Sequence, residues 1–311
     1  MAASTLHIAN GDNITQALKR IKINGEIITW REILCEGKTT IDIGSEVFWK
    51  TRFDFFKGSY KITKKAFIDY TLREYRNLCK QKTQEEIVLW FDNDLSCQIN
   101  MIAVISWLKR FRKGRKISIV LNKNNDMEVN FLQNKKNDLL IYYKNRITLN
   151  EDDIEYADYI WQLYCSDSPL RLENIHTFNT TSAFSNIEKT IKMHLKRFPS
   201  FKNGLNNLEN QILSLVGDSK IGDKKELITK ISENQKIYGF NDLQYTHKLD
   251  KMKKLFSSLN PVKLSKKGKM VLENQLNFYG QIRSDFSYLG GSKKYSYLYV
   301  NDTKKLLKIT S

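Results

Sequence analysis

Residues 87–111 read IVLWFDNDLSCQINMIAVISWLKRF, and this stretch decides the fold of the chain's first half. Its first five residues form a continuous apolar run, typical of a strand buried on both faces, which ends at Asp92-Asn93-Asp94. Apolar residues then recur at helical spacing, which predicts a helix over 95–111 that Gly114 ends. The run KISIVL at 116–121 predicts the next strand, so strands alternate with helices as in a parallel sheet.

The N-terminal residues show the same order of elements. Residues 4–9 predict a strand, Asn10-Gly11-Asp12 a turn, and the apolar spacing after it a helix. A second strand is predicted over 26–30, and residues 38–85 have a mostly helical pattern. We therefore expect an α/β domain over 1–125 with an open, mostly parallel, Rossmann-like sheet.

The second half predicts helices. Residues 126–185 read as a helical connector, with a polar stretch at 122–137, a helix capped by Asn150 and an exposed polar segment at 176–186. Residues 186–311 read as a basic, mainly helical domain. Helices are expected near 186–197, from Asn206, at 223–234, at 240–256 and around Met270, with short strands at 262–265 and 295–300. A winged-helix arrangement, whose second or third helix would enter a DNA groove, fits this order, and so do other small helical domains.

Composition narrows the class of protein. The 311 residues are 41% hydrophobic, enough for packed cores, and contain no run of eighteen apolar residues that would span a membrane. The N-terminus lacks a charged stretch followed by a long apolar one, so we expect no signal peptide. Because Cys35, Cys79, Cys97 and Cys165 are scattered, we expect neither a disulfide framework nor structural zinc, and a reducing cytoplasmic location.

The net charge of +17 is unevenly distributed. Residues 1–150 carry 26 basic and 16 acidic side chains, residues 151–175 carry 1 and 7, and residues 176–311 carry 24 and 11. Such a basic half attracts polyanions, so DNA or RNA is an expected partner, although an AT-rich genome also enriches lysine. The candidate phosphate contacts of a wing are Lys263, Lys266, Lys267, Lys269, Lys293 and Lys294, which a solvated surface explains equally well.

Polar residues follow three of the predicted strands. Because the carboxyl ends of parallel strands meet at one edge of a sheet, these side chains are expected in one crevice. The candidate ligand- or metal-binding residues are Asn10, Gly11, Asp12, Arg31, Glu32, Asp92, Asp94 and Gln98. Grouped carboxylates suit Mg²⁺ or Mn²⁺, and Gly11 before a helix leaves room for a small anionic ligand. The competing interpretation is that Asp and Asn only cap helices and make turns.

Four stretches of the sequence stand out as candidate family signatures. They are HIANGDNITQALKRIKINGEIITWREILCEG (7–37), IVLWFDNDLSCQINMIAVISWL (87–108), FPSFKNGLNNLENQILSLV (198–216) and VKLSKKGKMVLENQLNFYGQIRSDFSYLGG (262–291). These stretches resemble segments of one bacterial family, DUF1835, whose function is uncharacterised. The chain departs from the pattern at Tyr288-Leu289, where a Trp is expected before the paired glycines, and in the basic residues around Lys38. The resemblance implies a prokaryotic cytoplasmic protein with an α/β domain before a second domain, and it carries over no catalytic residues.

Three functions remain open at this point. In the first, the basic half binds DNA or RNA while the α/β crevice binds an anion or a metal. In the second, Asp12, Glu32, Asp92 and Asp94 hold a divalent ion in an enzyme that acts on a nucleotide or phosphoester. In the third, the protein is a non-catalytic adaptor whose charge reflects genome composition. We expect no membrane partner.

Overall fold

The computed structural model describes residues 4–122, 131, 136–177 and 182–309. Its central sheet has the order β2-β1-β4-β5-β6. The strands are β1 (Thr5–Asn10), β2 (Glu26–Trp30), β4 (Glu86–Trp90), β5 (Lys116–Val120) and β6 (Ile147–Thr148). The first four in this order run parallel, and β6 is antiparallel to β5. The predicted mostly parallel sheet is therefore confirmed, together with its four parallel strands.

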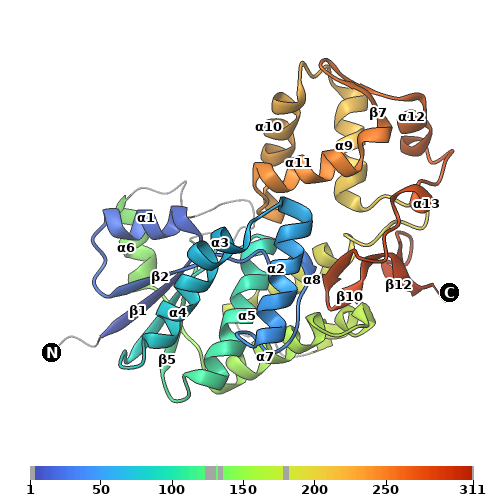
Figure 1. Ribbon diagram of the computed structural model, residues 1–311. Helices are drawn as coiled ribbons and strands as arrows, with labels where there is room; N and C mark the ends of the chain where they lie inside the picture. The colour runs from blue at the N-terminus through green and yellow to red at the C-terminus, as the bar shows by residue number, and fades with distance from the viewer. Residues whose placement is uncertain (1–3, 123–130, 132–135, 178–181, 310–311) are drawn as a thin grey trace.

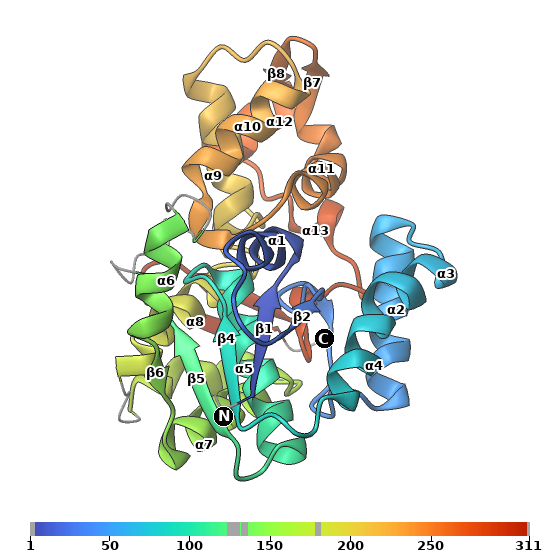
Figure 2. The ribbon, with the colours of Figure 1, turned by 90° about the vertical axis from the view of Figure 1, so that its left-hand side faces the viewer.

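Helices cover both faces of the sheet (Figures 1 and 2). On one face α5 (Leu95–Phe111) packs against α7 (Glu151–Tyr164) and α8 (Ile187–Leu195). Every residue of α5 from Leu95 to Leu108 is buried, which explains why its sequence lacks a polar face. On the other face α1 (Asp12–Arg20) and α6 (Lys136–Lys144) cover Val88 and Trp90 of β4. Since both faces are covered, the central strand β4 carries the continuous apolar run from Ile87 to Trp90.

Two parts of the expected connector belong to this body. Helix α7 begins with a capping box, in which Asn150 accepts from the amide of Asp153 and the Asp153 carboxylate accepts in return. The segment 176–186 was expected to be exposed, but Ala183 and Phe184 are buried against the helices below the sheet. Most of the polar stretch at 122–137 lies outside the described residues. Neither α6 nor β6 was predicted.

Residues 38–85 are mostly helical, as predicted. They form β3 (Gly37–Lys38), α2 (Glu46–Tyr60), α3 (Lys64–Phe67), a π turn (Ile68–Leu72) and α4 (Arg73–Lys80). Ser45 and Thr63 cap α2 and α3 by accepting backbone N–H groups. Helix α2 extends to the edge of the second half of the chain, where it contacts α11 (Asp242–Lys251).

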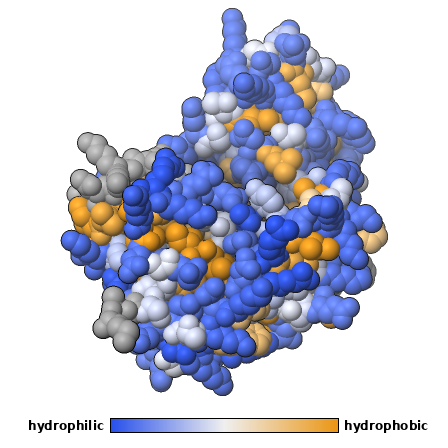
Figure 3. Space-filling view, turned by 60° about the vertical axis from the view of Figure 1, so that its left-hand side comes forward, coloured by the Kyte–Doolittle hydropathy of each residue, from blue (hydrophilic) through white to orange (hydrophobic). Residues whose placement is uncertain are grey.

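A second body, here called the lobe, rises beyond the sheet (Figures 1 and 2). It contains α9 (Asn207–Asp218), α10 (Lys224–Asn234), α11, β7 (Phe256–Leu259), β8 (Val262–Leu264), α12 (Lys266–Leu272) and α13 (Tyr279–Ile282). Strands β7 and β8 form an antiparallel hairpin, and Ile221 adds an antiparallel bridge to Val262. On the face drawn in Figure 3, hydrophilic residues cover most of the lobe, and apolar residues form a band across the body below it.

The end of the chain leaves the lobe and returns to the α/β body. Strand β9 (Tyr288–Gly290) pairs in parallel with β3 and antiparallel with β10 (Ser292–Lys293), and β11 (Tyr297–Val300) pairs with β12 (Lys305–Lys308). The strand expected from Tyr295 begins at Tyr297, because residues 294–296 form a 3-10 turn. Lys293 and Lys294 thus lie at the junction of the two bodies, away from the β7–β8 hairpin. No helix among the described residues is long and apolar enough to cross a bilayer.

Candidate functional site

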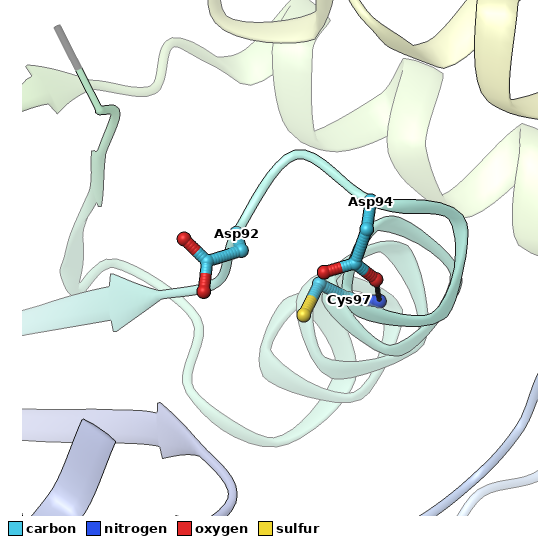
Figure 4. Close-up of side chains that lie close together, drawn as sticks. All are labelled: Asp92, Asp94 and Cys97. Carbon is cyan, nitrogen blue, oxygen red and sulfur yellow. Dashed lines mark hydrogen bonds between the residues drawn. The ribbon is translucent and has the colours of Figure 1, made fainter. Parts of the chain in front are cut away.

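The carboxyl end of β4 brings together Asp92, Asp94 and Cys97 (Figure 4). One ligand atom from each of them lies within 4.8 Å of the others, and all three residues are buried. Asp94 caps α5 by accepting from the amide of Cys97 at 2.9 Å. Asp92 accepts from the amide of Phe131 at 2.8 Å, so part of this cluster serves to hold the backbone.

Burial decides the charge of this cluster. Loss of solvent, and for Asp92 also the neighbouring Asp94, raises the pKa of both carboxyl groups, and burial likewise raises the pKa of the Cys97 thiol well above its usual value. Mg²⁺ and Mn²⁺ prefer several oxygen ligands and bound water, whereas this donor set offers one thiol and two carboxyl groups that already accept backbone N–H groups. The residues therefore do not fit Mg²⁺ or Mn²⁺.

Amide side chains complete a polar network beside the cluster. Asn100 donates to Oδ1 of Asn10 at 2.8 Å and to the carbonyl of Glu32 at 2.7 Å. Asn10 in turn donates to Sγ of Cys97 at 3.0 Å, and Gln98 donates to the carbonyl of Asp92 at 3.0 Å. The network ties the ends of β1, β2 and β4 to α5. Sequence reasoning missed Asn100, whose polar side chain within an otherwise apolar helix was the available signal.

The remaining candidate residues from the sequence lie outside the cluster of Asp92, Asp94 and Cys97. Asp12 forms an ion pair with Arg31 at 2.6 Å, with the guanidinium of Arg31 stacked 4.4 Å from the ring of Tyr70. Glu32 is buried and pairs with Arg52 at 2.9 Å. The same Arg52 donates to three backbone carbonyls of the segment 33–38. Gly11 precedes α1 with a positive φ of 87°. The structure thus brings Asn10, Asp92, Asp94 and Gln98 together and engages Asp12 and Glu32 in separate ion pairs.

A pocket of about 110 Å³ lies between the body and the lobe, and we call it the junction pocket. Helix α2 contributes Phe55, Ser59 and Tyr60 on one side, and α11 contributes His247, Lys248 and Lys251 on the other. The other lining residues are Glu36, Gly37, Arg197, Asn206, Leu208, Glu209, Phe286, Ser287, Tyr288, Leu289, Lys294 and Tyr295. Glu36, Glu209 and Tyr288 show that segments far apart in the sequence meet in this pocket.

Glu36 organises the wall of the junction pocket. Its carboxylate accepts from Lys248 and from Tyr60, receives Nε2 of Gln244 at 3.1 Å, and lies 3.7 Å from Arg197. Although burial opposes ionisation, Lys248 and Arg197 outweigh it and hold the pKa of Glu36 below its usual range. Glu36 therefore stays ionised, and it joins both bodies through a charged network. In the sequence, Glu36-Gly37 reads as a plain turn or a close-approach loop.

The candidate lysines of the second half divide between two places. Lys263 on β8 and Lys266, Lys267 and Lys269 on α12 gather at the hairpin end of the lobe. The turn that follows α11 adds Lys253 and Lys254, since Ser265, the cap of α12, donates to the Lys254 carbonyl at 3.1 Å. We call these six residues the lysine patch. Within the described residues, none of the six forms a salt bridge. Lys294, by contrast, pairs with Glu209 in the junction pocket at 3.3 Å.

Comparisons with known proteins give little. No family model and no curated protein matches the sequence. Among solved structures, the chain is similar to the Plasmodium falciparum topoisomerase II DNA-binding, cleavage and re-ligation domain, with 10% identity and a TM-score of 0.42. The match covers 74% of this chain and 39% of that one. A likeness this distant does not establish a shared fold.

Proposed function

We propose that the protein associates with nucleic acid through the lysine patch. The observation that carries the proposal is the patch itself, whose lysines lie on adjoining elements without acidic partners among the described residues. Five of the six side chains are exposed, and Lys267 is half-buried beside Gln281. Lysines that neutralise phosphates release the counterions condensed on the nucleic acid, which favours binding to DNA or RNA of any sequence.

The order of elements in the lobe supports a winged-helix assignment. Helix α9, the bridge at Ile221, α10, α11 and the β7–β8 hairpin follow one another as helix, strand, two helices and wing. Under this assignment α11 would be the third helix, but Gln244 and Lys248 turn its face toward Glu36 of the body. We therefore place the nucleic-acid contacts on the wing, α12 and the turn after α11.

Membership of the DUF1835 family and a cytoplasmic location are further parts of this proposal. The four quoted segments support the first, and the free cysteines Cys35, Cys79, Cys97 and Cys165 are consistent with a reducing compartment. The family has no assigned activity, so the proposal does not depend on it.

The structure gives less support to the two other functions. A metal-dependent phosphoesterase would need Asp12 and Glu32 beside Asp92 and Asp94, but both are engaged in ion pairs with arginines, and the donor set at Cys97 does not suit Mg²⁺. An adaptor function predicts no salt-dependent binding to nucleic acid, so the same experiment addresses it.

The test is fluorescence anisotropy of labelled duplex DNA, single-stranded DNA and RNA with the full chain, over a salt series. We expect binding at physiological salt that weakens as salt rises, with a steep linear slope of log K against log salt concentration. Absence of binding to all three polymers at low salt would overturn the proposal.

A further inference from the structure

We propose that the junction pocket is a binding site for a small anion that carries phosphate, separate from the nucleic-acid surface. Figures 1 and 2 place β7 and β8 at the outer end of the lobe and α11 at the end next to the body, so the two surfaces lie apart. The site belongs to neither the acidic cluster at Asp92 nor the lysine patch, and it does not depend on the nucleic-acid proposal.

The charge of the pocket is the first argument. Four cations line it, Arg197, Lys248, Lys251 and Lys294, against two carboxylates, Glu36 and Glu209. Arg197 and Lys248 pair with Glu36, and Lys294 pairs with Glu209. Lys251 has no ion pair among the described residues. The pocket therefore has an excess of two positive charges, which matches a phosphate dianion.

The position of Lys251 is the second argument. Lys251 lines the pocket although its side chain is exposed as a whole. Partial loss of solvent around its ammonium group, with repulsion from Lys294 and Lys248, lowers its pKa. A bound phosphate would relieve the repulsion among these three cations. His247 and Lys251 lie one helical turn apart on α11, so both reach the same space.

The neutral residues that line the pocket are the third argument, because they suit the substituent of a phosphate ester. Ser59 and Ser287 add hydroxyl groups to the lining, and Phe55 and Tyr288 add aromatic rings that suit an apolar or ring-shaped substituent. A cavity of about 110 Å³ accommodates the phosphate group. Since α2 and α11 both contact the pocket, an occupant would bridge the body and the lobe.

The probes are inorganic phosphate and pyrophosphate, titrated into the full chain at constant ionic strength, with Tm and calorimetric affinity as the readouts. The variants are Lys251→Gln and, as a matched control, Lys225→Gln, an exposed lysine on α10 outside both surfaces. Constant ionic strength is essential because general screening would otherwise change every surface interaction.

We expect either probe to raise the Tm of the wild type and of Lys225→Gln, and Lys251→Gln to bind about tenfold more weakly or worse. Without anion, Lys251→Gln should melt no lower than the wild type, because the substitution removes a repulsion. Equal binding by all three proteins would place the anion elsewhere and overturn the proposal. Lack of any effect of either probe on the wild type would overturn it as well, whatever the outcome with DNA.

Discussion

Gln244 on α11 donates a hydrogen bond of 3.1 Å to Oε2 of Glu36, a residue 208 positions earlier in the chain. Lys248, one turn further along the same helix, donates to the other oxygen of the same carboxylate. One buried carboxylate of the α/β body thus holds the helix that forms the floor of the lobe. Contacts of this kind fix the position of the lobe relative to the α/β body, because a buried charge tolerates little displacement from its partners.

Replacing Glu36 by Gln should destabilise the protein by about 3 kcal/mol, because Arg197 and Lys248 would be left in a poorly solvated site without a counter-charge. Urea unfolding of the full chain measures the effect. Asp54→Asn is the control, since the Lys50–Asp54 pair is exposed and its loss should cost about 1 kcal/mol or less. A change in Glu36→Gln as small as in the control would show that the carboxylate does not hold the bodies together.

The same variant should show a specific dependence on pH. The folded-state pKa of Glu36 is lowered from its ordinary 4.5, so its charge contributes stability above pH 4.5 that is lost as the pH falls further. The difference between wild type and Glu36→Gln should be constant from pH 7 to about 5 and should shrink below 4.5. Melting temperatures at closely spaced pH values test this. A difference that grows toward acid would contradict the assignment.

Asp92→Asn should change the stability in the opposite direction, so that the variant is more stable than the wild type at neutral pH. Burial raises the pKa of Asp92 well above its ordinary 3.8, so the ionised carboxylate costs stability once the pH rises beyond that value. Asparagine keeps the acceptor for the Phe131 amide, so the variant should gain about 1 kcal/mol or more at pH 7 and nothing at pH 3.

Thermal unfolding with and without EDTA provides the counter-test for Asp92. If EDTA destabilises the wild type but leaves Asp92→Asn unchanged, the cluster of Asp92, Asp94 and Cys97 holds a metal and its charge has been misjudged.

Gly239→Ala should loosen the lobe. Gly239 has φ of 63°, and a Cβ there would lie 1.9 Å from Oδ1 of Asp94, so the substitution combines backbone strain with a clash against the cap of α5. We expect a loss of about 2 kcal/mol or more in the free energy of unfolding. Gly58→Ala is the matched control: it lies in α2 with open space around it and should gain about 0.5 kcal/mol or more. If both variants melt alike, the contact between Gly239 and Asp94 is absent in solution.

The variants Lys266→Gln and Lys269→Gln test the nucleic-acid surface. If each lysine neutralises one phosphate, each variant should reduce the slope of log K against log salt concentration on duplex DNA by about 0.9. Affinity should fall to a similar extent on every sequence. Lys113→Gln is the control, an exposed lysine in the basic stretch after α5. An equal effect of Lys113→Gln would mean that binding follows net charge and that the lysine patch has no particular role.

The sequence predicted the sheet well and the junction poorly, for physical reasons. The strand over 86–90 and the helix over 95–111 carry strong local signals, since burial on both faces demands continuous apolar runs. Glu36, Gln244 and Lys248 carry no such signal, because they meet only through tertiary packing. The strand at 288–290 is three residues long and pairs with a two-residue strand, too short for an alternating pattern to stand out.

The candidate site shows the same division. Among the residues that follow strands, Asn10, Asp92 and Asp94 gather as expected, whereas Asp12 and Glu32 form separate ion pairs with arginines. The charge of Asp92 and Asp94 depends on burial, which spacing does not reveal: burial raises the pKa of both carboxyl groups. Arg52 also decides the role of Glu32, and it lies on a helix that no motif connects to that strand end.

The return of β9 to pair with β3 makes the lobe an insertion between two segments anchored on the same body, α8 on one side and β9 on the other. Because two chain segments connect the lobe to the body, the lobe can tilt about these two connections. It cannot move away from the body as a domain on a single flexible linker would. During synthesis, β3 also remains without its partner strand until residues 288–290 have been made, about 250 residues later, so this pairing closes a long loop and is expected to form slowly.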